Sequence, residues 1–229
     1  MTIISVDYRL SPEHKFPAAL QDVLDVYLWL LSQDGSQFLG FKPTKIALAG
    51  DSAGGNIVVA TTVVLNSLKQ NISKKDSFLN EFYFPKAVFS FYGVYLMTPN
   101  LSPSRIISLN DGLLNLGPLL ICINAYLPIA FKDHKTVSQF TKNPFLSPLL
   151  CKDFEFTKDI SLYLFETNFD SFLDDNVELA KRWKGNVHLE VFPDLPHGFL
   201  NLIKMSPKSQ QANDLCLENF AQFCNGDIK

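Results

Sequence analysis

Three side chains that together could cleave an ester occur along the chain in the order Ser52, Asp170, His197. A serine hydroxyl is a poor nucleophile near neutral pH, so it needs a neighbouring histidine as base, and the histidine needs a carboxylate that orients it. Each of the three residues directly follows a segment with the pattern of a β-strand. This shared position favours acyl transfer through a serine nucleophile.

The serine lies in the stretch Gly50–Asn56, between an apolar run at 46–49 and a long helical pattern. A Gly-x-Ser-x-Gly sequence at a strand-to-helix junction is typical of a nucleophile elbow, a turn so sharp that small residues must flank the serine. The same five-residue pattern also occurs by chance in glycine-containing loops. The strand before it and the helix after it favour the elbow, with Gly50 and Gly54 providing the room. The predicted elbow residues around the serine are Gly50, Asp51, Gly54 and Gly55.

Four histidines compete for the role of base. His14 and His134 lie in polar loops, where we expect them to be solvated, and His188 begins a strand and is expected at the sheet surface. His197 follows a strand and stands in Pro196-His197-Gly198. Proline restricts the backbone before the histidine and glycine allows a tight turn after it, so we predict that His197 is the base, with a structural turn histidine as the alternative.

Asp170, Asp174 and Asp175 are all candidates for the orienting carboxylate. Asp170 comes first after the predicted strand. The other two fall where a helix begins, a place that attracts carboxylates as caps. We therefore predict that Asp170 is the acid, and that Asp51 and Asp194 have structural roles.

The composition fits one globular domain. The chain has 229 residues, of which 47% are hydrophobic and 19% charged, and a net charge of −3. There is no cluster of Lys and Arg that would indicate nucleic acid, so none is expected as a partner. The four cysteines show neither metal-ligand nor redox spacing. No metal and no organic cofactor are expected, because a triad and backbone amides suffice for acyl transfer.

No secretory signal is present at the N-terminus, so a cytoplasmic location is expected. The mostly apolar stretch Leu113–Phe131 approaches the length of a membrane span, but Asn, Gly and Pro residues interrupt it. It is interpreted as one or two short helices of a soluble protein. We expect no transmembrane segment.

Strands alternate with helices along the chain. Strands are predicted at Thr2–Asp7, Ile46–Ala49, Ala87–Tyr92, Ser161–Glu166 and His188–Phe192. Amphipathic helices are predicted from Pro17 to Gly35, after the elbow, from about Asp174 to Lys184, and at the C-terminus. This order predicts an α/β chain with a mostly parallel sheet and flanking helices, in one domain spanning 1–229. The proline-rich region at about 94–147 interrupts the alternation and is predicted to be a lid-like insertion.

Three blocks of this sequence resemble motifs of the hormone-sensitive lipase family of α/β-hydrolases, whose triad follows the order nucleophile, acid, histidine. The resemblance implies an α/β-hydrolase fold with Ser52 as nucleophile, Asp170 as acid and His197 as base. The backbone N–H of Ala53 would then donate to the oxyanion. The blocks are Val6-Asp7-Tyr8-Arg9-Leu10-Ser11-Pro12-Glu13, Gly50-Asp51-Ser52-Ala53-Gly54-Gly55-Asn56 and Pro196-His197-Gly198-Phe199.

The family also has a His-Gly-Gly-Gly block, upstream of the Val-Asp-Tyr strand, whose amides form most of the oxyanion hole. This chain has no such block. The sequence is therefore interpreted as the C-terminal part of a catalytic domain, without the N-terminal strands and the oxyanion loop. Since removal of one oxyanion donor slows catalysis by about 10²- to 10³-fold, little turnover is expected of this chain alone.

The leading hypothesis is hydrolysis of carboxylic esters of lipids, such as acylglycerols or sterol esters, through an acyl-enzyme on Ser52. The first alternative is a soluble carboxylesterase or deacetylase acting on small esters or amides. The second is a non-catalytic ligand-binding relative or an inactive hydrolase-fold fragment. Peripheral association with lipid droplets and the oligomeric state are left open.

Overall fold

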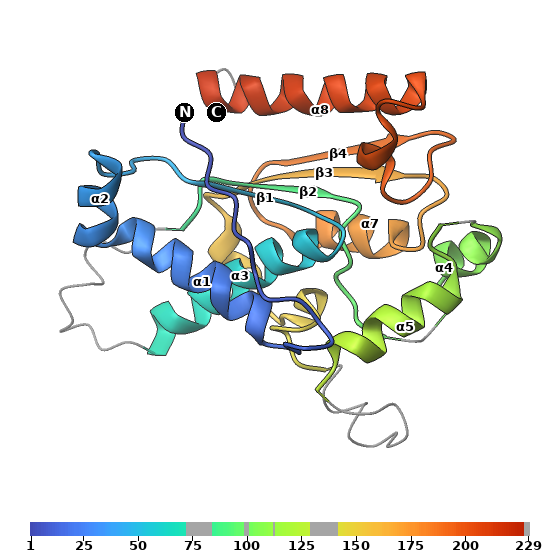
Figure 1. Cartoon of the computed structure of the whole chain (residues 1–229), viewed down its shortest axis with the longest axis horizontal. Coiled ribbons are helices and arrows are strands. Elements are labelled where there is room, and N and C mark those ends of the chain that lie inside the picture. The colour runs from blue at the N-terminus through green and yellow to red at the C-terminus, as the bar shows by residue number, and fades with distance from the viewer. Residues whose placement is uncertain (72–83, 99–100, 112, 129–141, 227–229) are drawn as a thin grey trace.

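The computed structural model describes residues 1–71, 84–98, 101–111, 113–128 and 142–226. Helices and strands alternate through most of this length (Figure 1). The α-helices are α1 (Ala18–Leu31), α2 (Gln33–Leu39), α3 (Ala53–Asn71), α4 (Pro103–Ile107), α5 (Leu116–Tyr126), α7 (Leu173–Arg182) and α8 (Pro207–Asn225). The strands are β1 (Ala47–Asp51), β2 (Ala87–Phe91), β3 (Ser161–Thr167) and β4 (Val187–Phe192). Short 3₁₀ turns are η2 (Ser108–Asn110), η3 (Pro148–Leu150), η4 (Glu155–Thr157) and η5 (Phe199–Leu202).

The strands form one parallel sheet in the order β1-β2-β3-β4. Successive side chains of a strand point to opposite sides of the sheet, and on the central strands the side chains on both sides are mostly apolar. On β3, Tyr163 and Phe165 pack against α8, whereas Leu162 and Leu164 pack among residues of α3 and α7. The predicted parallel α/β sheet is confirmed.

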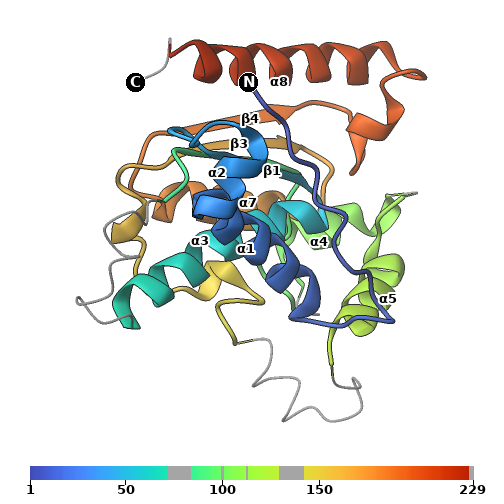
Figure 2. The same cartoon turned by 60° about the vertical axis from the view of Figure 1, so that its left-hand side comes forward.

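Helices cover both faces of this sheet. The amphipathic helix α8 lies across one face, and α1, α3 and α7 lie on the other, as the views in Figures 1 and 2 agree. The helix α3 is buried on most sides between the sheet and α1, which explains why apolar residues occur all round it. Because the four strands are parallel, their carboxyl ends all lie at one edge of the sheet.

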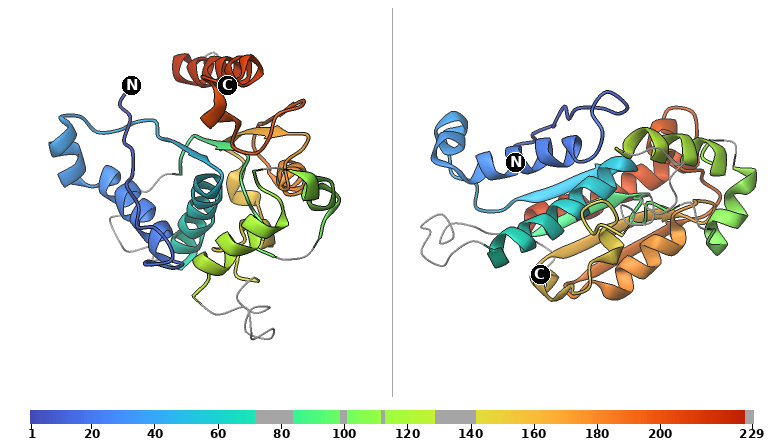
Figure 3. Two further views of the ribbon diagram at one scale, coloured as in Figure 1. Left: turned by 45° about the vertical axis from the view of Figure 1, so that its right-hand side comes forward. Right: turned by 90° about the horizontal axis from the view of Figure 1, so that it is seen from below.

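The described part of the predicted lid-like insertion consists of α4, η2 and α5, which lie beyond the ends of the strands (Figure 3). Ser102 caps the first turn of α4 through the amide of Arg105, and Asn115 caps α5 through the amide of Gly117. The short helices expected within the apolar stretch after Leu113 are represented by α5, while 129–131 of that stretch lie outside the described residues. No helix among the residues described is long and apolar enough to cross a membrane.

Two predicted elements are wrong. Residues 2–7 form no strand: they are largely exposed and have no ladder partner in the described structure, and β-branched residues alone cannot make a strand without a hydrogen-bonded neighbour. The helix predicted to reach Gly35 stops at Leu31 instead. Ser32 ends α1 and caps a new helix, α2, by accepting a hydrogen bond from the amide of Gly35.

The four cysteines are unpaired, and Cys216 is buried. Cys122 and Cys224 are exposed and Cys151 is half-buried.

Candidate active site

The backbone holds Ser52 in a strained turn between β1 and α3. Its φ of 51° lies in the left-handed region, which residues other than glycine seldom adopt. The amide of Ser52 donates to the carbonyl of Phe91 at 2.8 Å, which ties the turn to the end of β2. The turn therefore has the shape of a nucleophile elbow, with the hydroxyl at the carboxyl edge of the sheet.

One glycine of the turn has a different role from the one predicted. A Cβ on Gly50 would lie 2.4 Å from the carbonyl oxygen of Gly54, and a Cβ on Gly55 would lie 2.4 Å from Ser90 Oγ. A Cβ on Gly54 would meet nothing closer than 4.0 Å, at Asp51 Oδ1. The room that the turn needs is thus provided by Gly50 and Gly55. The prediction for Gly54 is wrong, because a Cβ at this position would have no close neighbour.

The structure brings the three predicted residues into one hydrogen-bonded chain. Ser52 Oγ lies 2.9 Å from His197 Nε2, and His197 Nδ1 lies 2.6 Å from Asp170 Oδ2. The other oxygen of Asp170 accepts the amide of Phe172 at 2.9 Å, and the carboxyl group is fully buried. The carboxylate favours the proton on Nδ1 of the imidazole, which leaves Nε2 to accept a proton from the serine.

Aromatic rings hold the imidazole in place, a feature that the sequence reasoning missed. The ring of Tyr92 meets His197 edge to face at 4.9 Å between centroids, and that of Phe172 does so at 5.5 Å. Gly198 has a φ of 73°, so the chain turns directly after the histidine. Tyr92 follows β2 and Phe172 follows Asp170 by two residues, so their positions after strands were the available signal.

Tyr92 also reaches the elbow. Its hydroxyl donates to Asp51 Oδ2 at 3.4 Å. Burial, followed by the negative charge of Asp51, raises the pKa of Tyr92 well above its ordinary value, so the phenol stays neutral. Asp51 thus lies beside the site but contacts a phenol, which agrees with its predicted structural role.

The two competing aspartates of α7 bind α4. Asp174 Oδ2 accepts the amide of Ser104 at 2.8 Å, and Asp175 forms a buried ion pair with Arg105 at 3.0 Å. Burial raises the pKa of Asp175 to about 6, against the opposing charge of the guanidinium. Both residues lie in the first turn of α7, as predicted, but their partners are on α4, and neither contacts the imidazole in the described structure.

The remaining candidates lie away from the serine. Asp194 pairs with Lys208 at 2.9 Å on the surface. His14 is exposed, and His188 is half-buried beside Glu190. His134 lies outside the described residues.

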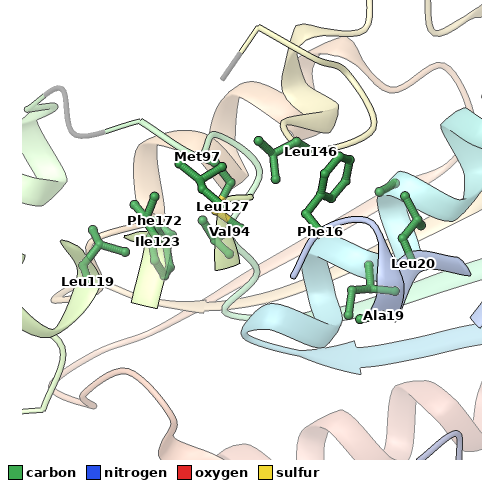
Figure 4. Packing of buried hydrophobic residues seen from close by; sticks show 12 residues of the cluster. Phe16, Ala19, Leu20, Val94, Met97, Leu119, Ile123, Leu127, Leu146 and Phe172 are labelled. Atoms are coloured by element: carbon green, nitrogen blue, oxygen red, sulfur yellow. The ribbon is translucent and has the colours of Figure 1, made fainter. Parts of the chain in front are cut away.

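A mostly apolar cavity of about 290 Å³ opens at Ser52. Its walls include Leu119 and Ile123 of α5 and Phe172, which lie near one another in Figure 4. Asn56 holds the surrounding loops, because its side-chain amide donates to the carbonyls of Val94 and Leu146. The cavity is therefore built from segments that are far apart in the sequence.

Ala53 lies in the wall of this cavity and is the first residue of α3. Amides in the first turn of a helix have no intrahelical partner, and the helix dipole is positive there. Ala53 therefore stands at a helix N-terminus directly after Ser52. No cluster of three or more metal-ligating side chains occurs among the residues that the structure describes.

Comparison with known proteins gives a consistent family assignment. A family model described as "alpha/beta hydrolase fold" matches residues 1–201. Human hormone-sensitive lipase is 36% identical over 137 residues, which are 60% of this chain and 11% of that protein. The carboxylic ester hydrolase LipN of Mycobacterium tuberculosis is 26% identical over 208 residues, or 89% of this chain and 50% of that protein.

Solved structures agree on the fold. An esterase from the bacterial hormone-sensitive lipase family superposes with a TM-score of 0.70 at 27% identity, and the match covers 93% of this chain and 62% of that one. The matched part of this chain thus spans half or less of the two relatives, and less than two thirds of the esterase.

Proposed function

The chain belongs to the alpha/beta hydrolase fold family, and we propose that it hydrolyses carboxylic esters of lipids, such as acylglycerols or sterol esters. The observation that carries the proposal is the hydrogen-bonded chain from Ser52 through His197 to Asp170, at the mouth of an apolar cavity. An acyl chain fits apolar walls, and the ester carbonyl would lie at the serine.

In the first half of the reaction, Ser52 Oγ attacks the ester carbonyl while His197 Nε2 takes the hydroxyl proton. Asp170 stabilises the imidazolium, and the amide of Ala53 donates to the oxyanion. The C–O bond to the alcohol then breaks, and His197 returns the proton to the leaving alkoxide. Water repeats the sequence on the acyl-enzyme and releases the carboxylic acid.

The test is covalent labelling of the purified chain with a fluorophosphonate, followed by ester hydrolysis with p-nitrophenyl butyrate and with a diacylglycerol emulsion. Labelling at Ser52 that is lost in Ser52→Ala is the expected result. Hydrolysis of the diacylglycerol is expected to be slow, because Ala53 is the oxyanion donor that this chain offers and loss of a single further donor already slows catalysis by about 10²- to 10³-fold. A folded chain that neither labels at Ser52 nor hydrolyses either ester would contradict the proposal and leave a non-catalytic hydrolase-fold protein.

A second candidate is a carboxylesterase or deacetylase for small substrates. The size of the cavity favours it, because about 290 Å³ is near the lower end of the usual range for ligand pockets. Hydrolysis of acetate or butyrate esters at a kcat/KM well above that for diacylglycerol would select this candidate.

We also propose a peripheral contact with lipid, as at a droplet surface in the cytoplasm. From Leu101 to Pro128 the only charged residues are Arg105, which is buried, and Asp111. Six large apolar side chains of this segment are 47–71% exposed: Leu101, Ile106, Ile107, Leu109, Leu113 and Ile121. Flotation with a neutral-lipid emulsion, reduced in Ile107→Ser and unchanged in the α8 control Leu217→Ser, is the expected result. Equal flotation of both variants and the parent chain would contradict it.

A further inference from the structure

Glu166 is a buried carboxyl group that the reaction described above does not use. It is the penultimate residue of β3 and is fully buried. Its Oε1 accepts the amide of Thr167 at 2.9 Å, while Oε2 has no hydrogen-bond partner in the described structure. A buried carboxylate without a cation is strongly unfavourable, so the protonation state of this group needs an explanation.

The groups that face Glu166 are mostly acidic or neutral. Asp170 lies four residues further along, and Asp175 approaches from α7 with its own cation, Arg105. Tyr95, after β2, donates its hydroxyl to Ser90 at 2.5 Å, and burial raises the pKa of Tyr95 far above its ordinary value. Among the described ion pairs none includes Glu166.

The environments of Glu166 and Asp170 differ in a way that separates their protonation. Asp170 uses both oxygens as acceptors, from His197 and from the amide of Phe172. Glu166 has one amide donor and one unpaired oxygen. Burial, and next the negative charge of Asp170, raise the pKa of Glu166 well above its ordinary value.

We propose that Glu166 and Asp170 form a buried carboxyl pair that holds one proton, with the proton on Glu166 and the negative charge on Asp170 facing His197. Two like charges in one buried site are unfavourable, so one carboxyl stays neutral. Glu166 is then a positioning residue: it lies buried beside Asp170 without adding a second charge to the triad. The inference rests on the proposed function, because the role assigned to Glu166 is to leave Asp170 as the charged partner of the base, His197.

The first experiment does not depend on activity. Infrared spectra of the full chain at pH 8 are compared for the parent, Glu166→Gln and the exposed control Glu218→Gln. The expected result is a protonated-carboxyl C=O band in the parent and in the control, absent from Glu166→Gln. Asp175, with a pKa raised to about 6, is ionised at this pH and does not contribute. Absence of the band from the folded parent overturns the inference, whatever the variants do.

The second experiment measures kcat/KM against pH for the same three proteins. The acid limb of this profile reports protonation of the base. If Glu166 is already neutral, replacing it by neutral glutamine leaves the apparent pKa of the acid limb within about 0.3 units of that of the parent. If Glu166 is ionised, removal of its negative charge lowers the apparent pKa of the acid limb by about one unit or more, and this result overturns the inference.

The two experiments also separate this inference from the proposed function. A chain that shows the infrared band but neither labels at Ser52 nor hydrolyses esters retains the carboxyl pair and loses the function. A chain that hydrolyses esters without the band retains the function and loses the pair.

Discussion

The carboxyl edge of the sheet and the apolar segment beyond it are built on different principles. At the edge, Ser52, Asp170 and His197 each follow a strand. Ser52 has a strained φ, the carboxyl group of Asp170 is buried, and the glycine after His197 has a left-handed backbone conformation. In the segment that carries α4 and α5, helix caps, a buried ion pair and hydrogen bonds to α7 and the loop before it hold short helices whose apolar side chains are partly exposed. Geometry is strict where bonds would form and break, and looser where an acyl chain would be held.

The largest expected effect is at the edge. Asp170→Asn should lower kcat by about 10⁴-fold, because the amide no longer holds the imidazole in the tautomer that accepts the serine proton. Ester hydrolysis is measured alongside the melting temperature. Asp194→Asn is the control, since its carboxylate forms an exposed pair with Lys208. Equal losses in the two variants would show that Asp170 is not the orienting acid.

The next effect is at the attachment of the outer segment. Arg105→Met should destabilise the fold by about 3–5 kcal/mol, because it leaves Asp175 buried without its cation. Lys208→Met, which removes an exposed cation of the pair with Asp194, should change stability by less than about 1 kcal/mol. Urea unfolding measures both. Similar midpoints would mean that α4 is not anchored through this ion pair.

Within the turn, the two neighbouring glycines should behave differently. Gly55→Ala should destabilise by about 1–3 kcal/mol, because its Cβ would clash with Ser90 Oγ and with Gly93 Cα at 2.8 Å. Gly54→Ala should be neutral or stabilise α3 by up to about 1 kcal/mol, since the position is open and alanine favours a helix. Thermal unfolding of both variants, with fluorophosphonate labelling, tests this order, and a reversed order would refute it.

The pH dependence of stability should reflect Glu166. Its pKa is raised in the folded chain, so above about the ordinary value of 4.5 the folded state binds more protons than the unfolded state. Stability therefore falls as pH rises through that window, up to the folded pKa. In Glu166→Gln this fall should be smaller, so its stability relative to the parent should increase from pH 5 to pH 8. A constant difference in urea midpoints across this range would contradict the prediction.

The smallest expected effect is in the outer segment. Cys122 of α5 is exposed and also lines the cavity at Ser52. Alkylation with iodoacetamide should reduce hydrolysis of a long-chain ester several-fold by narrowing the cavity, and Cys122→Ser should prevent the loss. The serine variant keeps the other exposed thiol, Cys224, and so controls for alkylation there. Full activity of the alkylated parent chain would show that α5 does not border the acyl site.

Local sequence was enough to predict most of the fold. The alternation of apolar runs and helical stripes predicted the parallel sheet, and a glycine-flanked serine between a strand and a helix predicted the sharp turn. The strand expected at 2–7 was wrong, because strand formation depends on a partner and not only on β-branched residues. Caps were also misjudged: Ser32 divides α1 from α2, although Gly35 was the expected stop.

The sequence by itself determined the order of the candidate residues and their places after strands, because steric preference and periodicity are carried by adjacent residues. Only the tertiary structure decided which carboxyl group meets His197, which glycine the turn needs, and that Tyr92 and Phe172 hold the imidazole. It also brought Glu166 and Asp170 into one buried site. These relations join residues of separate strands and helices, which meet only when the sheet pairs and its layers pack.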